Sequence, residues 1–485
     1  MIGLRDKPTG YVACVAVAAI VAVVGARNYA GGWNDGSRLA TVECLVDNHT
    51  LAIDQSVFVD VPHERVGTVE PFPYSRDDPG AWVFGTLDKI RVDGHWYSHK
   101  PPVPAVALAG AYAAWQKLAG GTARDRCNEF CYCMTLVSAG AAYVIAIASL
   151  FHLAGILGLT PMERLLVSGS FALTTMAPVY ARHVNDHILL LAVAMLAAAN
   201  LLKLAEAIET RGPSWRRDRM RLLLVGALGG LGYAIDQASG PLLLTALFAV
   251  IAYRTRGQFA GLVLFASAAL PCIVLHQALN YAVGGTIRPI GSVVEYFAWP
   301  GSPFSRETMT GFWNHPSLRH FVAYLSSMLF DLRRGFVLHN LSLLLLLPGV
   351  VTLWRRHAAQ RPELLALGGW AAGTWLAYGA LSNNLSGVCC SIRWFVPLLA
   401  FGYVALAVLV RHDERYRRGL WLLSAVGLPL AAMMWWNGPW REPETAFFVR
   451  LERAGVAVWL GWCVWAFLPA VRSAVRAFRP LTSPG

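Results

Sequence analysis

The sequence predicts an all-α polytopic membrane protein with about twelve transmembrane helices and one large polar loop near its N-terminus. Of its 485 residues, 56% are hydrophobic and only 14% are charged, so the apolar residues exceed what one soluble core can bury. They fall into runs of roughly 17 to 25 residues, the length with which a helix crosses a bilayer. The arginines cluster between these runs, which is the pattern of cytoplasmic loops and not of nucleic-acid binding.

Twelve apolar runs are long enough to be spans. They cover residues 10–30, 131–157, 163–181, 187–206, 221–236, 238–253, 258–280, 338–354, 363–381, 393–410, 419–436 and 454–471. If these spans alternate in direction, the basic clusters between them all lie on one side of the membrane. Because Lys and Arg near the ends of spans resist translocation, that side is the cytoplasm. Both termini are then cytoplasmic.

Residues 102–119 are also apolar, but a span there would invert every later basic loop. We therefore predict an interfacial or re-entrant helix on the outer side. Prolines at 101, 102 and 104 can begin such a helix because its first turn needs no backbone donors.

The predicted organisation has five parts. They are a first transmembrane helix (1–30), a large extracytoplasmic loop with interfacial helices (31–120), a transmembrane core (121–280), a second extracytoplasmic loop (281–338) and C-terminal transmembrane helices (339–485). Both outer loops are rich in polar and aromatic residues, which suits the membrane interface.

Three groups of ionisable residues face the outer compartment in this topology. Asp35 and Arg38 follow the first span, with Asp35 or Ser37 as a candidate helix N-cap and with Asp35 and Arg38 on one face. Lys100 precedes a double proline at the membrane edge, where it can snorkel or bind a phosphate as a point charge. Asp186 begins the fourth span, where it can complement the helix dipole or form part of a site.

In their order and placement these groups resemble the GT-C glycosyltransferases that use polyprenyl-phosphate sugar donors. The resemblance is greatest to the branch of protein O-mannosyltransferases and the lipid A aminoarabinose transferase. In that family the first outer loop opens with an acidic residue followed three places on by Arg, as at Asp35 and Arg38. The loop closes on an aromatic residue, one or two further residues and Lys-Pro-Pro, as in residues 97–102. A second acidic residue begins a later span, as Asp186 does.

Weaker similarities follow along most of the chain. The Gly-Pro at 240–241 resembles part of a Lys-Gly-Pro span, residues 334–336 resemble an Arg-Gly-Leu-Phe segment, and residues 391–397, which include Arg393, resemble a Gly-Pro-Arg-Tyr-Leu-Leu-Pro run. The chain differs from the aminoarabinose enzyme before the Lys-Pro-Pro lysine, where that enzyme has an acidic metal ligand and this chain has His99. An imidazole also binds divalent ions, but the sequence indicates no second ligand, so metal use is left open.

The resemblance implies a GT-C-like bundle and a membrane glycosyltransferase, either a hexosyl- or a pentosyltransferase. The enzyme would carry a sugar from a polyprenyl-phosphate donor to a glycan, lipid or protein acceptor on the outer side of the membrane. The arginine bias of the chain favours a bacterial inner membrane. Asp35 would act on the acceptor as a general base, or orient it, with support from Asp186, while cations would hold the departing phosphate. The implied site residues are Asp35 and Asp186 (catalytic), Arg38, Lys100 and Arg393 (donor phosphate), Tyr97 and His99 (substrate), and His99 (a possible divalent metal).

A multispan transporter or lipid-linked sugar flippase would have the same composition and number of spans. Its sequence sign is ionisable residues in the middle of spans, and few are present here. Lys203 and Glu206 lie near a cytoplasmic end, and Asp236 lies in a short outer turn. A non-catalytic scaffold would leave the ordered acidic, arginine and Lys-Pro-Pro elements unexplained. The sequence therefore favours the glycosyltransferase, without indicating the sugar or the acceptor.

Overall fold

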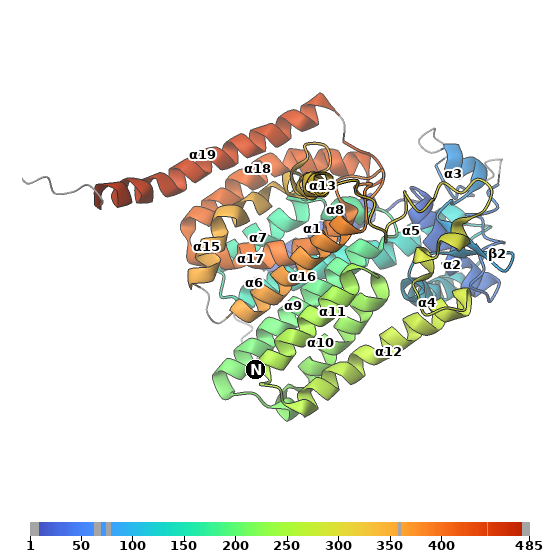
Figure 1. Cartoon of the computed structure of the whole chain (residues 1–485), viewed down its shortest axis with the longest axis horizontal. Helices are drawn as coiled ribbons and strands as arrows, with labels where there is room; N and C mark the ends of the chain where they lie inside the picture. Colours follow the sequence, from blue (N-terminus) through green and yellow to red (C-terminus); the bar gives the residue numbers. More distant parts are fainter. Residues whose placement is uncertain (1–8, 63–68, 74–78, 357–359, 444, 478–485) are drawn as a thin grey trace, which may run out of the picture.

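The computed structural model describes residues 9–62, 69–73, 79–356, 360–443 and 445–477, which are mostly helical (Figure 1). The α-helices are α1 (Thr9–Gly25), α2 (Trp33–Asp47), α3 (Pro79–Phe84), α4 (Pro102–Ala119), α5 (Cys127–Thr135), α6 (Ala141–Ile156), α7 (Pro161–Thr174), α8 (Ala177–Tyr180), α9 (Asp186–Arg211), α10 (Trp215–Ile235), α11 (Ser239–Arg254), α12 (Phe259–Gly284), α13 (Leu318–Phe330), α14 (Phe336–His339), α15 (Leu346–Arg356), α16 (Arg361–Ala380), α17 (Leu399–His412), α18 (Glu414–Asn437) and α19 (Ala446–Ala477). The other elements are the π-helix η1 (Leu136–Gly140), the 3-10 helices η2 (Ile290–Ser292), η3 (Val294–Phe297), η4 (Leu341–Leu345) and η5 (Arg393–Leu398), and the strands β1 (Lys89–Val92) and β2 (His95–Ser98).

Each predicted span coincides with one helix or with a run of consecutive helices. Among the described residues, six helical stretches are long and apolar enough to cross a membrane. They are Cys127–Ile156, Asp186–Arg211, Phe259–Gly284, Arg393–His412, Glu414–Asn437 and Ala446–Leu468. The total of about twelve spans stays a prediction, and so does the location of the termini, because both chain ends lie outside the described residues.

The predicted span 163–181 is divided between α7 and α8. Thr175 is extended, with φ −117° and ψ 176°, and the side chain of Asn340 accepts the N–H of Met176 at 2.9 Å. The Thr175 hydroxyl accepts the N–H of Ala177 at 3.2 Å. The interruption is tolerated at this depth because these buried side chains satisfy the free backbone groups.

Two helices form the centre of the bundle. In the apolar part of α9, 78% of the residues are buried, and in that of η5–α17 the share is 89%. The share is only 22% in both α12 and α19, which lie on opposite sides of the bundle (Figure 1). Helix α12 exposes apolar side chains such as Val263, Leu270 and Val274, as a lipid-facing helix does.

Helices α10 and α12 approach closely at two glycines. A Cβ atom on Gly226 would lie 2.2 Å from the carbonyl oxygen of Phe265, and one on Gly230 would lie 2.2 Å from that of Ala269. Gly226 and Gly230 form a G-x-x-x-G pattern, which brings helix backbones together in membranes.

A second core lies in the first outer loop, at one end of the bundle (Figure 1). Helices α2 and α4 pack together there, and their residues Leu39 and Tyr112 belong to one buried cluster with Phe58, Phe72 and Phe130. Helix α4 has the bounds predicted from its prolines, while its position at the membrane interface stays a prediction.

The all-α prediction missed an antiparallel hairpin in this loop, with Lys89 paired to Ser98 and Val92 to His95. Its turn residues Asp93 and Gly94 both have positive φ, 50° and 89°, which is typical of an Asp-Gly hairpin turn. The hairpin is too short to show a clear alternation of apolar residues in the sequence.

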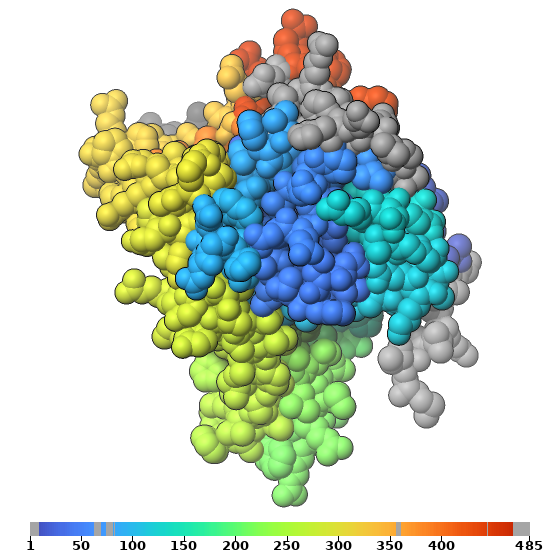
Figure 2. Space-filling view, turned by 90° about the vertical axis from the view of Figure 1, so that its right-hand side faces the viewer, coloured from blue at the N-terminus to red at the C-terminus, as the bar shows by residue number. Residues whose placement is uncertain are grey.

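The second outer loop packs on the hairpin. Ile90 and Val92 share a small core with Ile290, Phe297 and Met309. Figure 2 shows the two outer loops side by side on one face, blue for the first and yellow for the second. The first outer loop, which follows α1, and the second outer loop, which follows α12, thus share one core.

We predict that alanine at Gly226 or Gly230 lowers the thermal unfolding midpoint in detergent, because the added methyl group collides with the α12 backbone. The expected cost is about 1–3 kcal/mol. Gly369→Ala in α16 is the matched control, since a Cβ there meets nothing within 4 Å. Equal midpoints for all three variants would contradict the close contact.

Candidate functional site

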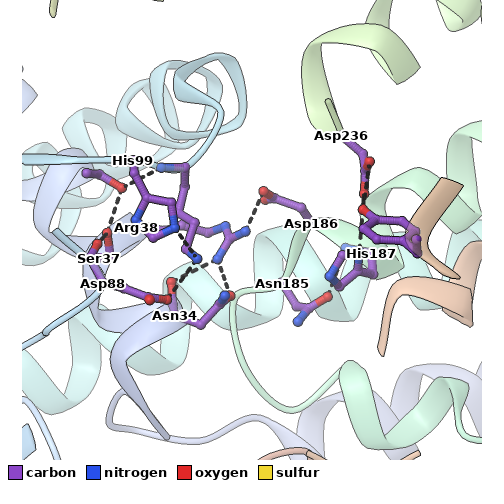
Figure 3. Close-up of polar contacts among 12 residues, drawn as sticks. Asn34, Ser37, Arg38, Asp88, His99, Asn185, Asp186, His187 and Asp236 are labelled. Atoms are coloured by element: carbon purple, nitrogen blue, oxygen red, sulfur yellow. Dashed lines mark hydrogen bonds and ion pairs between the residues drawn. The ribbon is translucent and has the colours of Figure 1, made fainter. Parts of the chain in front are cut away.

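The segment 182–187, which leads into α9, joins three parts of the structure. It is entirely buried, and three of its four ionisable side chains are each paired with a charged residue from a different place. The pairs are His183 Nδ1 with Asp35 Oδ2 at 3.1 Å, Asp186 Oδ2 with Arg38 Nη2 at 2.6 Å, and His187 Nδ1 with Asp236 Oδ2 at 3.5 Å. Figure 3 shows Asp186 turned toward Arg38 and His187 turned toward Asp236.

Arg38 is the centre of the first of two polar clusters. Its Nη2 donates to Asp186, and its Nη1 donates to the backbone carbonyl of Asn34 at 2.8 Å and to the Asn34 side chain. The Arg38 and Asp186 side chains are only 7% and 3% exposed, and Asp186 Oδ1 has no hydrogen-bond partner among the described residues. The partner of Arg38 is thus Asp186 and not Asp35, with which the sequence placed it on one helix face.

Asp35 holds the start of α2. Its Oδ2 accepts the N–H of Gly31 at 2.6 Å and its Oδ1 accepts the N–H of Gly32 at 3.0 Å. The N-cap residue is Gly32, so the prediction of Asp35 or Ser37 at that position was wrong: Asp35 lies in the first turn and its carboxylate reaches back. A Cβ on Gly31 would lie 2.6 Å from the His183 ring, so only glycine fits there. The catalytic role of Asp35 stays a prediction.

Lys100 lies in a second group of contacts, at the end of the hairpin. Its Nζ is 2.8 Å from Asp88 Oδ2 and 2.9 Å from His99 Nε2. The pairing of Lys89 with Ser98 places Asp88 beside His99 and Lys100. The pKa of Lys100 is lowered to about 8, mainly by burial and also by the charges of Arg38 and Arg393, while Asp88 opposes the decrease. Burial raises the pKa of Asp88, but Lys100 and the other nearby cations outweigh it and keep this pKa below its usual range.

The structure brings the predicted cations into one electrostatic environment. The charges of Arg38 and Arg393 act on Lys100, although the three residues come from distant parts of the chain. Arg393 lies over the ring of Trp440, with its guanidinium carbon 5.5 Å from the ring centroid, and no carboxylate of the described residues pairs with it.

A narrow pocket opens beside Lys100. Its polar lining residues include Arg38, Tyr97 and Lys100. Its apolar lining residues include Pro101, Pro102, Ala105, Val283 and Ile290. The pocket therefore joins positive charge to an apolar wall built from α4, the end of α12 and η2.

His99 does not fit as a metal ligand. Its Nε2 faces the ammonium of Lys100, and its ring lies edge-on to Phe297 and Phe304 at 5.4 and 6.1 Å between centroids. No group of three or more His, Cys, Asp or Glu side chains within the described ranges could hold a metal ion. We therefore assign no step to a metal at His99.

The sequence did not assign roles to Asp88, His183, His187 or Asp236. Asp236 closes α10 and accepts the N–H groups of Ala238 and Ser239 at 2.9 and 2.7 Å. The available signal was the density of polar residues in 182–187, at the outer end of a span. Single histidines gave no pattern that would identify their partners.

The sequence matches no protein-family model and no curated protein sequence. Among solved structures, ArnT from Cupriavidus metallidurans bound to undecaprenyl phosphate is similar, with a TM-score of 0.53 and 13% sequence identity, over 96% of this chain and 79% of that chain. The chain has the GT-C fold.

The GT-C fold predicted from the order of the motifs is thus confirmed. The apo state of the same ArnT gives a TM-score of 0.49 at 14% identity, over 95% of this chain and 76% of that one. The Archaeoglobus fulgidus oligosaccharyltransferase in its apo form gives 0.43 at 13% identity, over 94% and 55%. We base the fold on the bound ArnT alone.

We predict that Asp186→Ala destabilises the protein by about 3–5 kcal/mol, because it leaves the buried Arg38 guanidinium without its carboxylate. Thermal unfolding in detergent measures the effect. Glu414→Ala is the control, since Glu414 pairs with Arg418 at an exposed position. A double variant, Arg38→Met with Asp186→Leu, is expected to recover much of the loss. Equal unfolding midpoints for Asp186→Ala and Glu414→Ala would show that the pair is not structural.

Proposed function

We propose that this chain transfers a sugar from a polyprenyl-phosphate donor to an acceptor at the outer face of a bacterial inner membrane. The observation that carries the proposal is the pocket that joins Arg38 and Lys100 to an apolar wall at one end of a GT-C bundle. A polyprenyl phosphate has the same two parts, an anionic head and a long apolar chain. In the similar ArnT structure the bound molecule is undecaprenyl phosphate.

The cations suit the leaving group of this reaction. A phosphate departs with little need for a proton, so fixed positive charge is the expected complement. Lys100 and Arg393 would contact the phosphate, with Arg38 beside them. Helix α12, which borders the pocket and is mostly exposed toward lipid, leaves a route for the isoprenoid chain from the bilayer.

The carboxylates suit the acceptor. During transfer, the acceptor oxygen bonds to the anomeric carbon, the bond from that carbon to the phosphate oxygen breaks, and its electron pair leaves with the phosphate. A hydroxyl acceptor also gives up its proton to a base. Asp186 Oδ1 has no partner in the part of the chain that the structure describes, whereas both oxygens of Asp35 accept backbone N–H groups. Asp186 is therefore the better placed base, with Asp35 orienting α2 and His183.

We predict that Lys100→Met lowers kcat/KM for transfer of labelled sugar in proteoliposomes by about 100-fold or more, because it removes a charge at the leaving group. Lys117→Met is the matched control, since Lys117 lies exposed near the end of α4, the helix that follows Lys100. Asp186→Asn and Asp35→Asn compare the two carboxylates, and a larger loss of kcat is expected for Asp186→Asn.

The same experiment tests the transporter alternative. Labelled product that depends on Lys100 supports the transferase. Donor that crosses from one leaflet to the other without any glycosidic product favours a flippase and contradicts the proposed function.

The pH dependence follows from Lys100. Its pKa in the folded protein is about 8, and only the protonated form attracts the phosphate. We predict that the alkaline limb of the kcat/KM profile is flat at pH values below the pKa of Lys100 and falls as pH rises through about 8. Arginine at position 100 stays protonated, so any residual activity of Lys100→Arg is expected to lose this decline. A decline of the same shape in Lys100→Arg would assign it to another group.

A further inference from the structure

Two side chains beside Lys100 have no part in the proposed reaction. Asp88 Oδ2 and His99 Nε2 lie 2.8 and 2.9 Å from the ammonium nitrogen. The side chains of Lys100 and Asp88 are 12% and 11% exposed. Water therefore contributes little to holding the ammonium of Lys100. The position of this ammonium depends on Asp88 and His99.

The hairpin and α2 fix these neighbours in place. The Ser37 hydroxyl on α2 donates to the backbone carbonyl of Asp88 at 2.6 Å and lies 2.6 Å from the Ser98 hydroxyl. The backbone N–H of Lys100 donates to that Ser98 hydroxyl at 3.2 Å. Asp88 and Lys100 are thus both tied to Ser37 on α2, the residue directly before Arg38.

His99 Nε2 is placed to accept a hydrogen bond from the Lys100 ammonium. Burial lowers the pKa of His99 to about 3, and the charge of Lys100 acts in the same direction. The ring is therefore neutral, and Nε2 accepts a hydrogen bond from the Lys100 ammonium. The other ring nitrogen, Nδ1, is buried and has no hydrogen-bond partner within the described ranges. A divalent ion on Nε2 would have to displace the ammonium.

One N–H donor of the Lys100 ammonium is left after Asp88 and His99 have accepted the other two. An ammonium group has three N–H donors, and Asp88 and His99 accept two of them. The third N–H remains for an oxygen of the donor phosphate, in a direction set by the other two. Two fixed acceptors thereby restrict a flexible side chain to one geometry, which lowers the entropy lost when the phosphate binds.

We propose that Asp88 and His99 are positioning residues that aim Lys100 at the donor phosphate, so that this chain binds its donor without a divalent ion at His99. The inference rests on the proposed function, whose donor supplies the phosphate. Asp88 and His99 act through Lys100 and do not touch the reacting atoms.

The first test is binding of undecaprenyl phosphate to the full chain in nanodiscs. The protein is treated with a chelator, its metal content is measured, and binding is recorded before and after Mg²⁺, Mn²⁺ or Zn²⁺ is added. We expect the metal-free protein to bind with a Kd within about twofold of that with each ion, a difference smaller than one hydrogen bond produces. Binding that requires one equivalent of an ion, with that ion lost in His99→Phe, would overturn the inference while leaving the function intact. No binding under any condition would instead contradict the proposed function.

The second test separates positioning from folding. We expect Asp88→Asn to lower kcat for transfer about tenfold while KM stays equal or falls, because a negative charge that competes with the phosphate has gone. Asp88 raises the pKa of Lys100, so its loss is expected to move the alkaline decline of kcat/KM to lower pH. A purely structural residue would not shift this profile.

The controls lie in the same part of the chain. Asp93→Asn changes an exposed turn residue with φ 50°, which asparagine tolerates well, and is expected to behave as wild type. His99→Phe keeps a ring against Phe297 and Phe304 but removes the acceptor, and His99→Gln restores an acceptor. We expect kcat to fall in the first and to recover partly in the second. Unchanged kcat and pH profile in both Asp88→Asn and His99→Phe would overturn the positioning role.

Discussion

The buried ion pair between Arg38 and Asp186 is the contact on which the arrangement of the site depends. It joins the core of the first outer loop to the start of α9, the helix at the centre of the bundle. Removing two charges from water costs several kcal/mol per ion, so the pair is stable only when its geometry is good and the remaining donors are satisfied. Asn34 accepts from Nη1 of Arg38 through its backbone carbonyl and its side chain, while Arg38 Nε and Asp186 Oδ1 have no partner among the described residues. The outer loop is therefore held in one position on the bundle.

The other site contacts follow from this position. Asp35 lies in the first turn of α2, where its carboxylate contacts His183. The same carboxylate accepts the N–H groups of Gly31 and Gly32 and so fixes the residues before the helix. Ser37, on the same helix, holds the hairpin that carries Asp88 and leads to Lys100. A positive pocket thus forms where α2, the hairpin and α12 meet, and one side of it is apolar. This combination of charge and apolar surface suits an amphipathic phosphate better than a soluble one.

Hydropathy and basic clusters were sufficient to place the apolar helices of the bundle, because membrane burial leaves a direct record in local composition, but they did not predict α13 in the second outer loop or the break between α7 and α8. The prolines at 101 and 102 marked the start of α4, because proline is tolerated in the first turn of a helix. The partners of charged residues were not predictable in this way. Arg38 meets a residue 148 positions away, while the sequence suggested a neighbour on its own helix. The hairpin was missed because its strands have four residues each, and its register is what places Asp88 on Lys100.

The measurement that tests the central claim most directly is photocrosslinking of the full chain in nanodiscs with a polyprenyl phosphate that carries its reactive group next to the phosphate. The crosslinked peptides are then mapped by mass spectrometry. The account predicts crosslinks in residues 97–105 and 283–290, which include most of the pocket lining, and competition by unlabelled undecaprenyl phosphate. Crosslinks confined to the middle of the bundle helices, with none near Lys100, would contradict it.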